Sequence, residues 1–290
     1  IILISFLGLI EASYSQIPDR YIRATDLAKR WDEGIPLGNG LLGALVWNKN
    51  GQIRFALDQA ELWDERPMKD LHGPHFSYQW VEENWKAGTY KKVQGALDHP
   101  YDREPAPTKI PGAAIEIPHS IVGSNPEVKL DLFTASVEIK GKNGVELISF
   151  VDANQPVGWI KINNLSTPFS ASLIIPPYQN KVQSIGDVVG GDDLGRLGYA
   201  KALIDSNSNF KSFLQKGWGA FSYRSTMQWN QRGNEVTIIW TIQSNDQNQA
   251  PSLDTISLSK LLNKGFDDAF KQHQVWWNNH WKKSALQVPD

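Results

Sequence analysis

Four carboxylates lie within eight residues of the chain, a density that suggests acid–base chemistry. They belong to Asp58, Glu61, Asp64 and Glu65. Two carboxyl groups that flank a glycosidic bond can act as proton donor and base when their surroundings separate their pKa values. The more ordinary interpretation is that Asp58 ends a strand while the others cap a short helical turn or lie in solvent. The sequence favours the ordinary interpretation, because it shows neither the separation of these groups nor their burial.

A glycine-rich stretch upstream matches the pattern of a dinucleotide-binding loop. The segment WDEGIPLGNGLLGALVW contains Gly-Asn-Gly-Leu-Leu-Gly from Gly38 to Gly43, and Asp58 follows where such a fold holds a ribose. That fold needs a buried parallel strand before the first glycine, but Asp32, Glu33 and Pro36 lie there instead. The pattern therefore indicates a tight loop between strands, in which glycine permits positive φ or a close approach: Gly38, Gly40 and Gly43.

The histidines offer a weak case for a metal ion. His72 and His75 lie beside Asp70 in a loop rich in glycine and proline, which is more typical of a solvated surface than of a metal site. His273 and His280 are seven residues apart, about 10 Å along a helix, which is too far to share one ion. We therefore expect no metal and no cofactor.

The elements that position these residues are mainly strands. Residues 41–58 predict two strands joined at Asn50-Gly51, a strong hairpin signal, and residues 59–67 then suggest one helical turn. Residues 76–97 predict a helix. Many short alternating strands with turn signals occupy 113–245, a pattern that favours a large sandwich over βαβ units.

The spacing of apolar residues changes near the C-terminal end of the sequence. Apolar residues recur at helical spacing over 257–283 and predict one long amphipathic helix. We expect it to pack against something further along the chain. Its aromatic end has two interpretations, a platform that stacks on sugar or a helix face buried between two domains, and the broad arc favours the interface: Trp276, Trp277 and Trp281.

Composition limits the class of partner. The 290 residues are 41% hydrophobic and carry a net charge of −2, with no basic stripe for nucleic acid and no polybasic membrane anchor. Twelve tryptophans make carbohydrate a reasonable ligand, although core packing is the commoner role of any one of them. The absence of cysteine excludes disulfides and thiolate metal sites.

The first residues predict export. Residues 1–10 form an apolar run too short to span a bilayer, and the small residues Ser13 and Ser15 precede a possible cleavage point. Residues 1–15 are therefore interpreted as the remnant of a signal peptide, in preference to a buried strand. A secreted or periplasmic location follows from this interpretation.

The stretches WDEGIPLGNGLLGALVW, IRFALDQAELWDERP and HQVWWNNHWKKSALQVPD together resemble glycoside hydrolase family 95. The first two are similar to the opening of its N-terminal domain, and the third is similar to the helix that links this domain to an (α/α)6 barrel. The resemblance is specific at 31–64 and 273–290 and architectural between them. The chain departs from the family at Leu57-Asp58-Gln59, where Leu-Asn-Glu is usual.

The resemblance implies a mainly β fold, a β-super-sandwich over 16–256, followed by a linker helix over 257–290. Family members are inverting exo-hydrolases of α-L-fucosides and α-L-galactosides. Their catalytic carboxylates come from the barrel, which this sequence lacks, so the expected role is to support the barrel and one rim of its pocket. Candidates for that rim or for the domain interface are Trp31, Asn39, Asp58, Trp63, Asp64, Trp276, Trp277 and Trp281.

The expected partners are an oligosaccharide or glycan and the chain's own C-terminal barrel, with neither nucleic acid nor membrane. A standalone carbohydrate-binding module is the alternative function, and exposed aromatic side chains on a sandwich face would distinguish it. A phosphorylase resembling family 65 is a third interpretation, which would need a phosphate site in the barrel.

Overall fold

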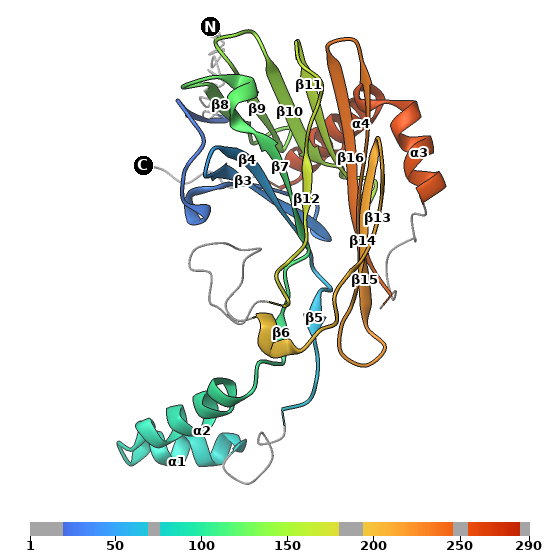
Figure 1. Cartoon of the computed structure of the whole chain (residues 1–290). Helices are drawn as coiled ribbons and strands as arrows, with labels where there is room; N and C mark the ends of the chain where they lie inside the picture. Colours follow the sequence, from blue (N-terminus) through green and yellow to red (C-terminus); the bar gives the residue numbers. More distant parts are fainter. Residues whose placement is uncertain (1–19, 69–75, 180–193, 246–254, 285–290) are drawn as a thin grey trace, which may run out of the picture.

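In a computed structural model of the chain, two antiparallel sheets face each other (Figure 1). The structure describes residues 20–68, 76–179, 194–245 and 255–284. The mainly β sandwich expected from the sequence is confirmed, and a helical segment follows it at the C-terminal end. Among the described residues, no helix has the length and apolar character needed to cross a membrane.

The larger sheet has nine strands in the order β1-β8-β9-β10-β11-β16-β15-β14-β13. Their bounds are Tyr21–Ala24, Glu127–Asp131, Ser136–Lys140, Glu146–Val151, Gly158–Asn163, Glu235–Ser244, Ser222–Arg232, Phe210–Lys216 and Leu203–Asn207. Neighbouring strands are mostly hairpin partners, and three of the turns, β9–β10, β14–β15 and β15–β16, carry a glycine with positive φ (Gly144, Gly219 and Gly233).

The smaller sheet has five strands in the order β12-β7-β4-β3-β2. Their bounds are Ser172–Ile174, Ala113–Pro118, Gln52–Gln59, Leu42–Lys49 and Ile35–Gly38. β3 and β4 form the predicted hairpin, and Asn50 (φ 52°) and Gly51 (φ 80°) both adopt positive φ at its turn. Alternate residues of both sheets point inward and fill one core, among them Ile53, Phe55, Ile115, Ile160 and Ile238.

Residues 59–67 do not form the predicted helical turn. They contain β5 (Trp63–Asp64), which pairs with β6 (Thr108–Lys109) in a ribbon below the smaller sheet (Figure 1). The backbone N–H of Ile110 also donates to the carbonyl of Leu62 at 3.0 Å. Pairing with a distant segment therefore prevailed over a local helical tendency that only a few residues supported.

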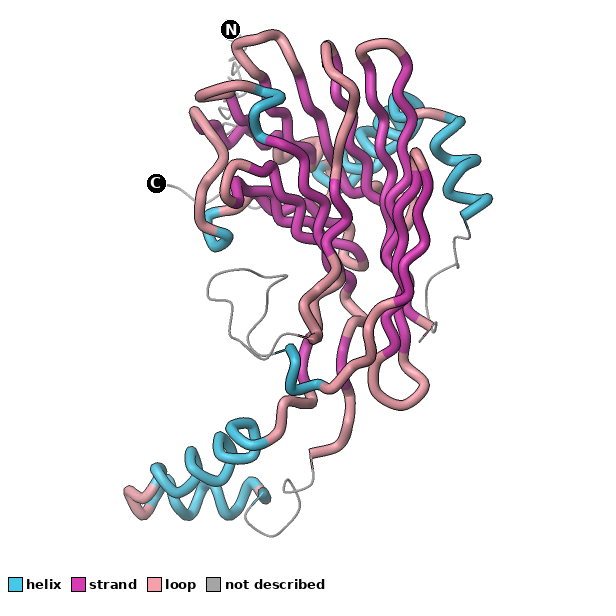
Figure 2. Tube along the Cα trace, in the orientation of Figure 1, coloured by secondary structure: helices cyan, strands magenta, loops and turns pink. Residues whose placement is uncertain are grey.

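The helix predicted over 76–97 is two helices, α1 (Tyr78–Lys86) and α2 (Tyr90–Arg103). Gly88 adopts φ 68° between them, a conformation that ends the first helix. Figure 2 shows this pair as a helical hairpin that projects from the sandwich. Within it, α1 has no buried residue.

The prediction of one long helix over 257–283 was also wrong. The segment forms α3 (Thr255–Lys264) and α4 (Phe266–Trp281), because Gly265 has φ 103° and breaks the helical hydrogen-bond pattern. Both helices pack on the outer face of the larger sheet, so this segment has a partner within the chain. The contact consists of Phe150, Val157, Trp159, Ile239, Leu258, Leu262 and Phe266.

His273 fixes the middle of α4 to the sandwich. Its Nε2 lies 2.7 Å from the carbonyl oxygen of Thr134, and its Nδ1 accepts the backbone N–H of Ala153 at 3.1 Å. The ring is fully buried against Phe150. Burial lowers its pKa from 6.5 to about 4, so the folded chain holds a neutral imidazole with the proton on Nε2.

Acid is therefore expected to weaken the fold through His273. The unfolded chain binds a proton near pH 6.5 and the folded chain near pH 4, so stability falls as pH falls through that window. At pH 5 the loss is about 2 kcal/mol relative to neutral pH. Urea unfolding at pH 7.5 and pH 5 measures it, and His273→Asn, which keeps a donor and an acceptor, should reduce the difference. An equal pH dependence in both proteins would contradict this assignment.

Candidate functional site

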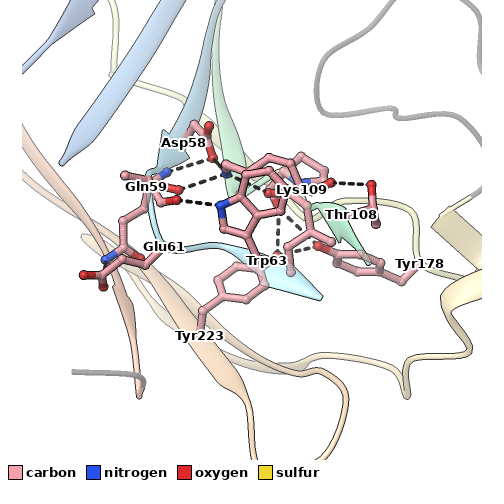
Figure 3. Close-up of polar contacts among 11 residues, drawn as sticks. Asp58, Gln59, Glu61, Trp63, Thr108, Lys109, Tyr178 and Tyr223 are labelled. Atoms are coloured by element: carbon pink, nitrogen blue, oxygen red, sulfur yellow. Dashed lines mark hydrogen bonds and ion pairs between the residues drawn. The ribbon is translucent and has the colours of Figure 1, made fainter. Parts of the chain in front are cut away.

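The segment after β4 exposes one tryptophan and buries one carboxylate. Leu62 is fully buried and anchors the segment, while Trp63 has an exposed fraction of 45% and Asp64 of 1%. This alternation follows from the extended backbone of β5, which points successive side chains to opposite sides. The indole N–H of Trp63 donates to the carbonyl oxygen of Ala60 at 3.0 Å, which holds the ring in place (Figure 3).

Asp58 lies near the end of β4 and forms an ion pair with Lys109. The ammonium of Lys109 is 2.5 Å from its carboxylate and also donates to the carbonyl oxygens of Gln59 (2.9 Å) and Ile110 (3.3 Å). Figure 3 shows these contacts converging on Lys109. The pair therefore ties the end of β4 to β6 through one oxygen of the Asp58 carboxylate.

Side-chain hydrogen bonds from Arg66 and Tyr199 hold the buried carboxylate of Asp64. Arg66 donates to both of its oxygens, at 2.9 and 2.6 Å, and the hydroxyl of Tyr199 donates at 2.7 Å. Burial opposes the ionisation of Asp64, but these hydrogen bonds outweigh it and hold the pKa below its ordinary value. Burial and the neighbouring carboxylate raise the pKa of Tyr199. A carboxylate held ionised in this way is a poor proton donor, which argues against a catalytic role for Asp64.

Two further tyrosines support the same region. The hydroxyls of Tyr178 and Tyr223 are 3.2 Å apart, and both donate to the carbonyl oxygen of Pro111, at 3.1 and 3.2 Å (Figure 3). Burial raises the pKa of both, so they remain neutral phenols. Their hydrogen bonds hold the chain at Pro111, just after β6, and β6 is the strand that pairs with Trp63 and Asp64 of β5.

A cleft opens between this segment and the turn from β14 to β15. Its volume is about 270 Å³, and its lining residues are Glu61, Trp63, Asp64, Glu65, Trp218, Ala220, Phe221 and Asn245. Trp218 has an exposed fraction of 46%, close to that of Trp63. The cleft therefore presents two half-exposed indoles together with carboxylates, a combination typical of sites that bind sugars.

The turn that carries Trp218 is held by its own hydrogen bonds. The backbone N–H of Gly217 donates to the carbonyl of Phe221 at 2.9 Å, and the N–H of Phe221 donates to the carbonyl of Trp218 at 3.1 Å. Asn245 accepts the backbone N–H of Ser222 at 2.8 Å and donates to the carbonyl of Ala220 at 2.6 Å. Both ends of the Asn245 amide are thus used to brace the turn.

The structure brings together only part of the predicted set. Trp63 and Asp64 line the cleft with Glu61 and Glu65, and Asp58 lies behind them. Trp31 is an exposed residue of a short 3-10 helix (Trp31–Glu33) and does not line the cleft. Sequence reasoning missed Trp218, Phe221 and Asn245, although the glycine-flanked Trp218 in KGWGAF was a visible signal of an exposed turn.

The glycine loop is the predicted tight turn between two strands. Gly38 and Gly43 pair across β2 and β3, and Gly40 adopts φ 89° at the tip. The Asn39 carboxamide accepts the backbone N–H groups of Leu41 and Leu42, at 3.0 and 2.8 Å. Nothing in this geometry resembles a helix N-terminus that would hold a phosphate, because β3 follows the loop directly.

Asn39 also joins the two sheets. Its amide nitrogen donates to the carbonyl oxygens of Asp152 (2.8 Å) and Gln155 (3.4 Å), in the turn between β10 and β11. We expect Asn39→Ala to destabilise the fold by about 1–2 kcal/mol. Asn39→Asp keeps the acceptor for the loop but removes the donor, so it should cost a similar amount in urea unfolding. An Asn39→Asp variant as stable as the original would show that the cross-sheet bond is unimportant.

The tryptophans of α4 form an aromatic cluster away from the cleft. Trp276 stacks on His280 at 5.3 Å and remains 41% exposed. Trp281 lies 5.8 Å from the ring of Phe133, and its indole N–H donates to the carbonyl oxygen of Leu132 at 3.1 Å. Trp277 is half-buried between these groups. Trp281 therefore packs against the sandwich, whereas Trp276 remains partly exposed to solvent.

The predicted loop of His72, His75 and Asp70 lies outside the described residues, as do residues 1–15. Within the described ranges, no three histidine, aspartate or glutamate side chains gather as a metal site would require. No protein-family model matches the chain, and no curated protein matches it at a significant level.

Proposed function

We propose that this chain is the non-catalytic, glycan-contacting sandwich domain of a secreted glycoside hydrolase that resembles family 95. The observation that carries the proposal is the cleft between β5 and the β14–β15 turn, with its two half-exposed indoles, Trp63 and Trp218. Flat aromatic faces stack on the C–H faces of sugar rings, and neighbouring carboxylates accept hydrogen bonds from hydroxyl groups.

The carboxylates of this cleft serve in binding and support. Asp64, which lines the cleft, is tied to Arg66, and Asp58, which lies behind it, is paired with Lys109. The reaction itself, inversion at an α-L-fucosidic or α-L-galactosidic bond, belongs to an (α/α)6 barrel that the resemblance places after residue 290. The sandwich then supports the barrel and contacts the glycan.

A standalone carbohydrate-binding module is the second candidate. The half-exposed indoles of Trp63 and Trp218 serve it equally well, because exposed aromatic side chains on a sandwich are what a binding module would present to a sugar. The two candidates share the binding site and differ in whether a catalytic part is attached to it.

Sequencing the coding DNA beyond the codon for residue 290 separates the two candidates. We expect a long open reading frame that encodes helical hairpins with spaced carboxylates. The protein extended by that frame should release L-fucose or L-galactose from α-linked substrates as the inverted anomer, which nuclear magnetic resonance detects directly. A stop codon at this position would remove the hydrolase proposal and leave the binding module.

A further inference from the structure

The charged side chains that line the cleft are all acidic. Three of its lining residues, Glu61, Asp64 and Glu65, are acidic, and none is lysine, arginine or histidine. Arg66 compensates Asp64. Glu61 contacts only neutral groups, the amide of Gln59 and the hydroxyl of Ser244. In the part of the chain that the structure describes, Glu61 and Glu65 have no ion-pair partner, and two negative charges therefore remain at the cleft.

Several hydrogen-bonding groups of the cleft are already engaged within the fold. The indole N–H of Trp63 is used by Ala60, and the amide of Asn245 is used within its own turn. The carboxylate oxygens of Glu61 and Glu65 remain for a ligand, together with the indole N–H of Trp218, which has no hydrogen-bond partner among the described residues. Carboxylates accept hydrogen bonds from hydroxyl and ammonium groups, but they repel another carboxylate.

We propose that the cleft selects neutral and amino-bearing sugars and rejects uronic acids. This inference rests on the proposed glycan binding and names the ligand class of the same site. A protonated amino group held near Glu61 and Glu65 is attracted, while a uronate at the same place is repelled. Because the cleft is open to solvent, the effect is modest, about five-fold in affinity in each direction at low salt.

Three oligosaccharides of equal length test the inference: a neutral glucan, a glucosamine oligomer and a glucuronic acid oligomer. Their dissociation constants are measured with the intact chain by calorimetry at pH 6, in 20 mM and 500 mM NaCl. We expect the amino oligomer to bind about five-fold tighter than the neutral one and the acidic oligomer about five-fold weaker, with both differences shrinking at high salt.

Glu65→Gln should reduce the preference for the amino oligomer while it preserves binding of the neutral one. Asp268→Asn is the matched control, because Asp268 is an exposed acid of α4, which contributes no residue to the cleft. Binding of the acidic oligomer as tight as that of the neutral one would overturn the inference, and so would an equal effect of both variants. Binding of none of the three would overturn the proposed function itself and, with it, this inference.

Discussion

Replacing Asp64 with alanine is expected to destabilise the folded chain by about 3 kcal/mol. The substitution leaves the guanidinium of Arg66 and the hydroxyl of Tyr199 without the acceptor that both use in the folded chain. Removing one partner of a buried ion pair is costly, because the remaining charge stays in an environment that solvates it poorly. Urea unfolding, followed by tryptophan fluorescence, measures the change.

Asp58→Ala provides the matched control. Asp58 is also a carboxylate in an ion pair, but its side chain is 45% exposed, so water can solvate Lys109 when the carboxylate is removed. The expected loss is below about 1 kcal/mol. Equal losses for the two variants would contradict the distinction that burial makes between these acids.

The Asp64 network also predicts a dependence on pH. The folded chain holds the pKa of Asp64 below its unfolded value, so the stability it contributes is present above that unfolded value. This contribution is lost as pH falls through the lower, folded pKa. Asp64→Asn should therefore be less stable than the original chain at neutral pH and should approach it in strong acid.

Replacing both Trp63 and Trp218 with alanine is expected to weaken glycan binding about 100-fold. Each half-exposed indole supplies a flat face at the cleft, and truncating such an anchor costs about 1–2 kcal/mol. The two losses together correspond to about two orders of magnitude in the dissociation constant. Calorimetric titration with a neutral oligosaccharide that binds the original chain measures the effect.

The control for this pair is Trp85→Ala. Trp85 is the more exposed residue, at 69%, but it lies on the helical hairpin and lines no part of the cleft. Its loss should leave affinity unchanged. If Trp85→Ala weakens binding as much as the double variant does, the aromatic contact is not confined to the cleft.

The sequence predicted the sandwich well because its signals are local and repeated. Alternation of apolar residues, together with turns such as Asn50-Gly51, identifies strands and the hairpins between them without knowledge of the rest of the fold. The tight loop at Gly38–Gly43 was predicted correctly for a similar reason, since acids and a proline precede it.

The breaks within helices were missed because apolar periodicity continues across them. Gly88 and Gly265 each carry positive φ and end a helix, while the residues on both sides keep helical spacing. A single glycine within a periodic stretch is a weak signal, since it costs only about 1 kcal/mol in a helix. The structure shows that the chain turns at both positions.

The cleft could not be predicted as a whole because its two walls are far apart in the sequence. Trp63 comes from β5, and Trp218 comes from a turn more than 150 residues later. The different roles of the four carboxylates were also not visible in the sequence. Asp64 became a buried structural anion because β5 turns it inward towards Arg66 and Tyr199, and that orientation depends on pairing with β6.

The indole N–H signals of the twelve tryptophans report directly on whether a glycan lies against Trp63 and Trp218. These signals can be assigned with single Trp→Phe variants and followed by nuclear magnetic resonance during titration with a neutral oligosaccharide. We predict that the signals of Trp63 and Trp218 shift and saturate together, while those of the buried Trp159 and Trp240 stay in place. Shifts confined to other tryptophans, or no shifts at saturating glycan, would contradict this placement of the glycan.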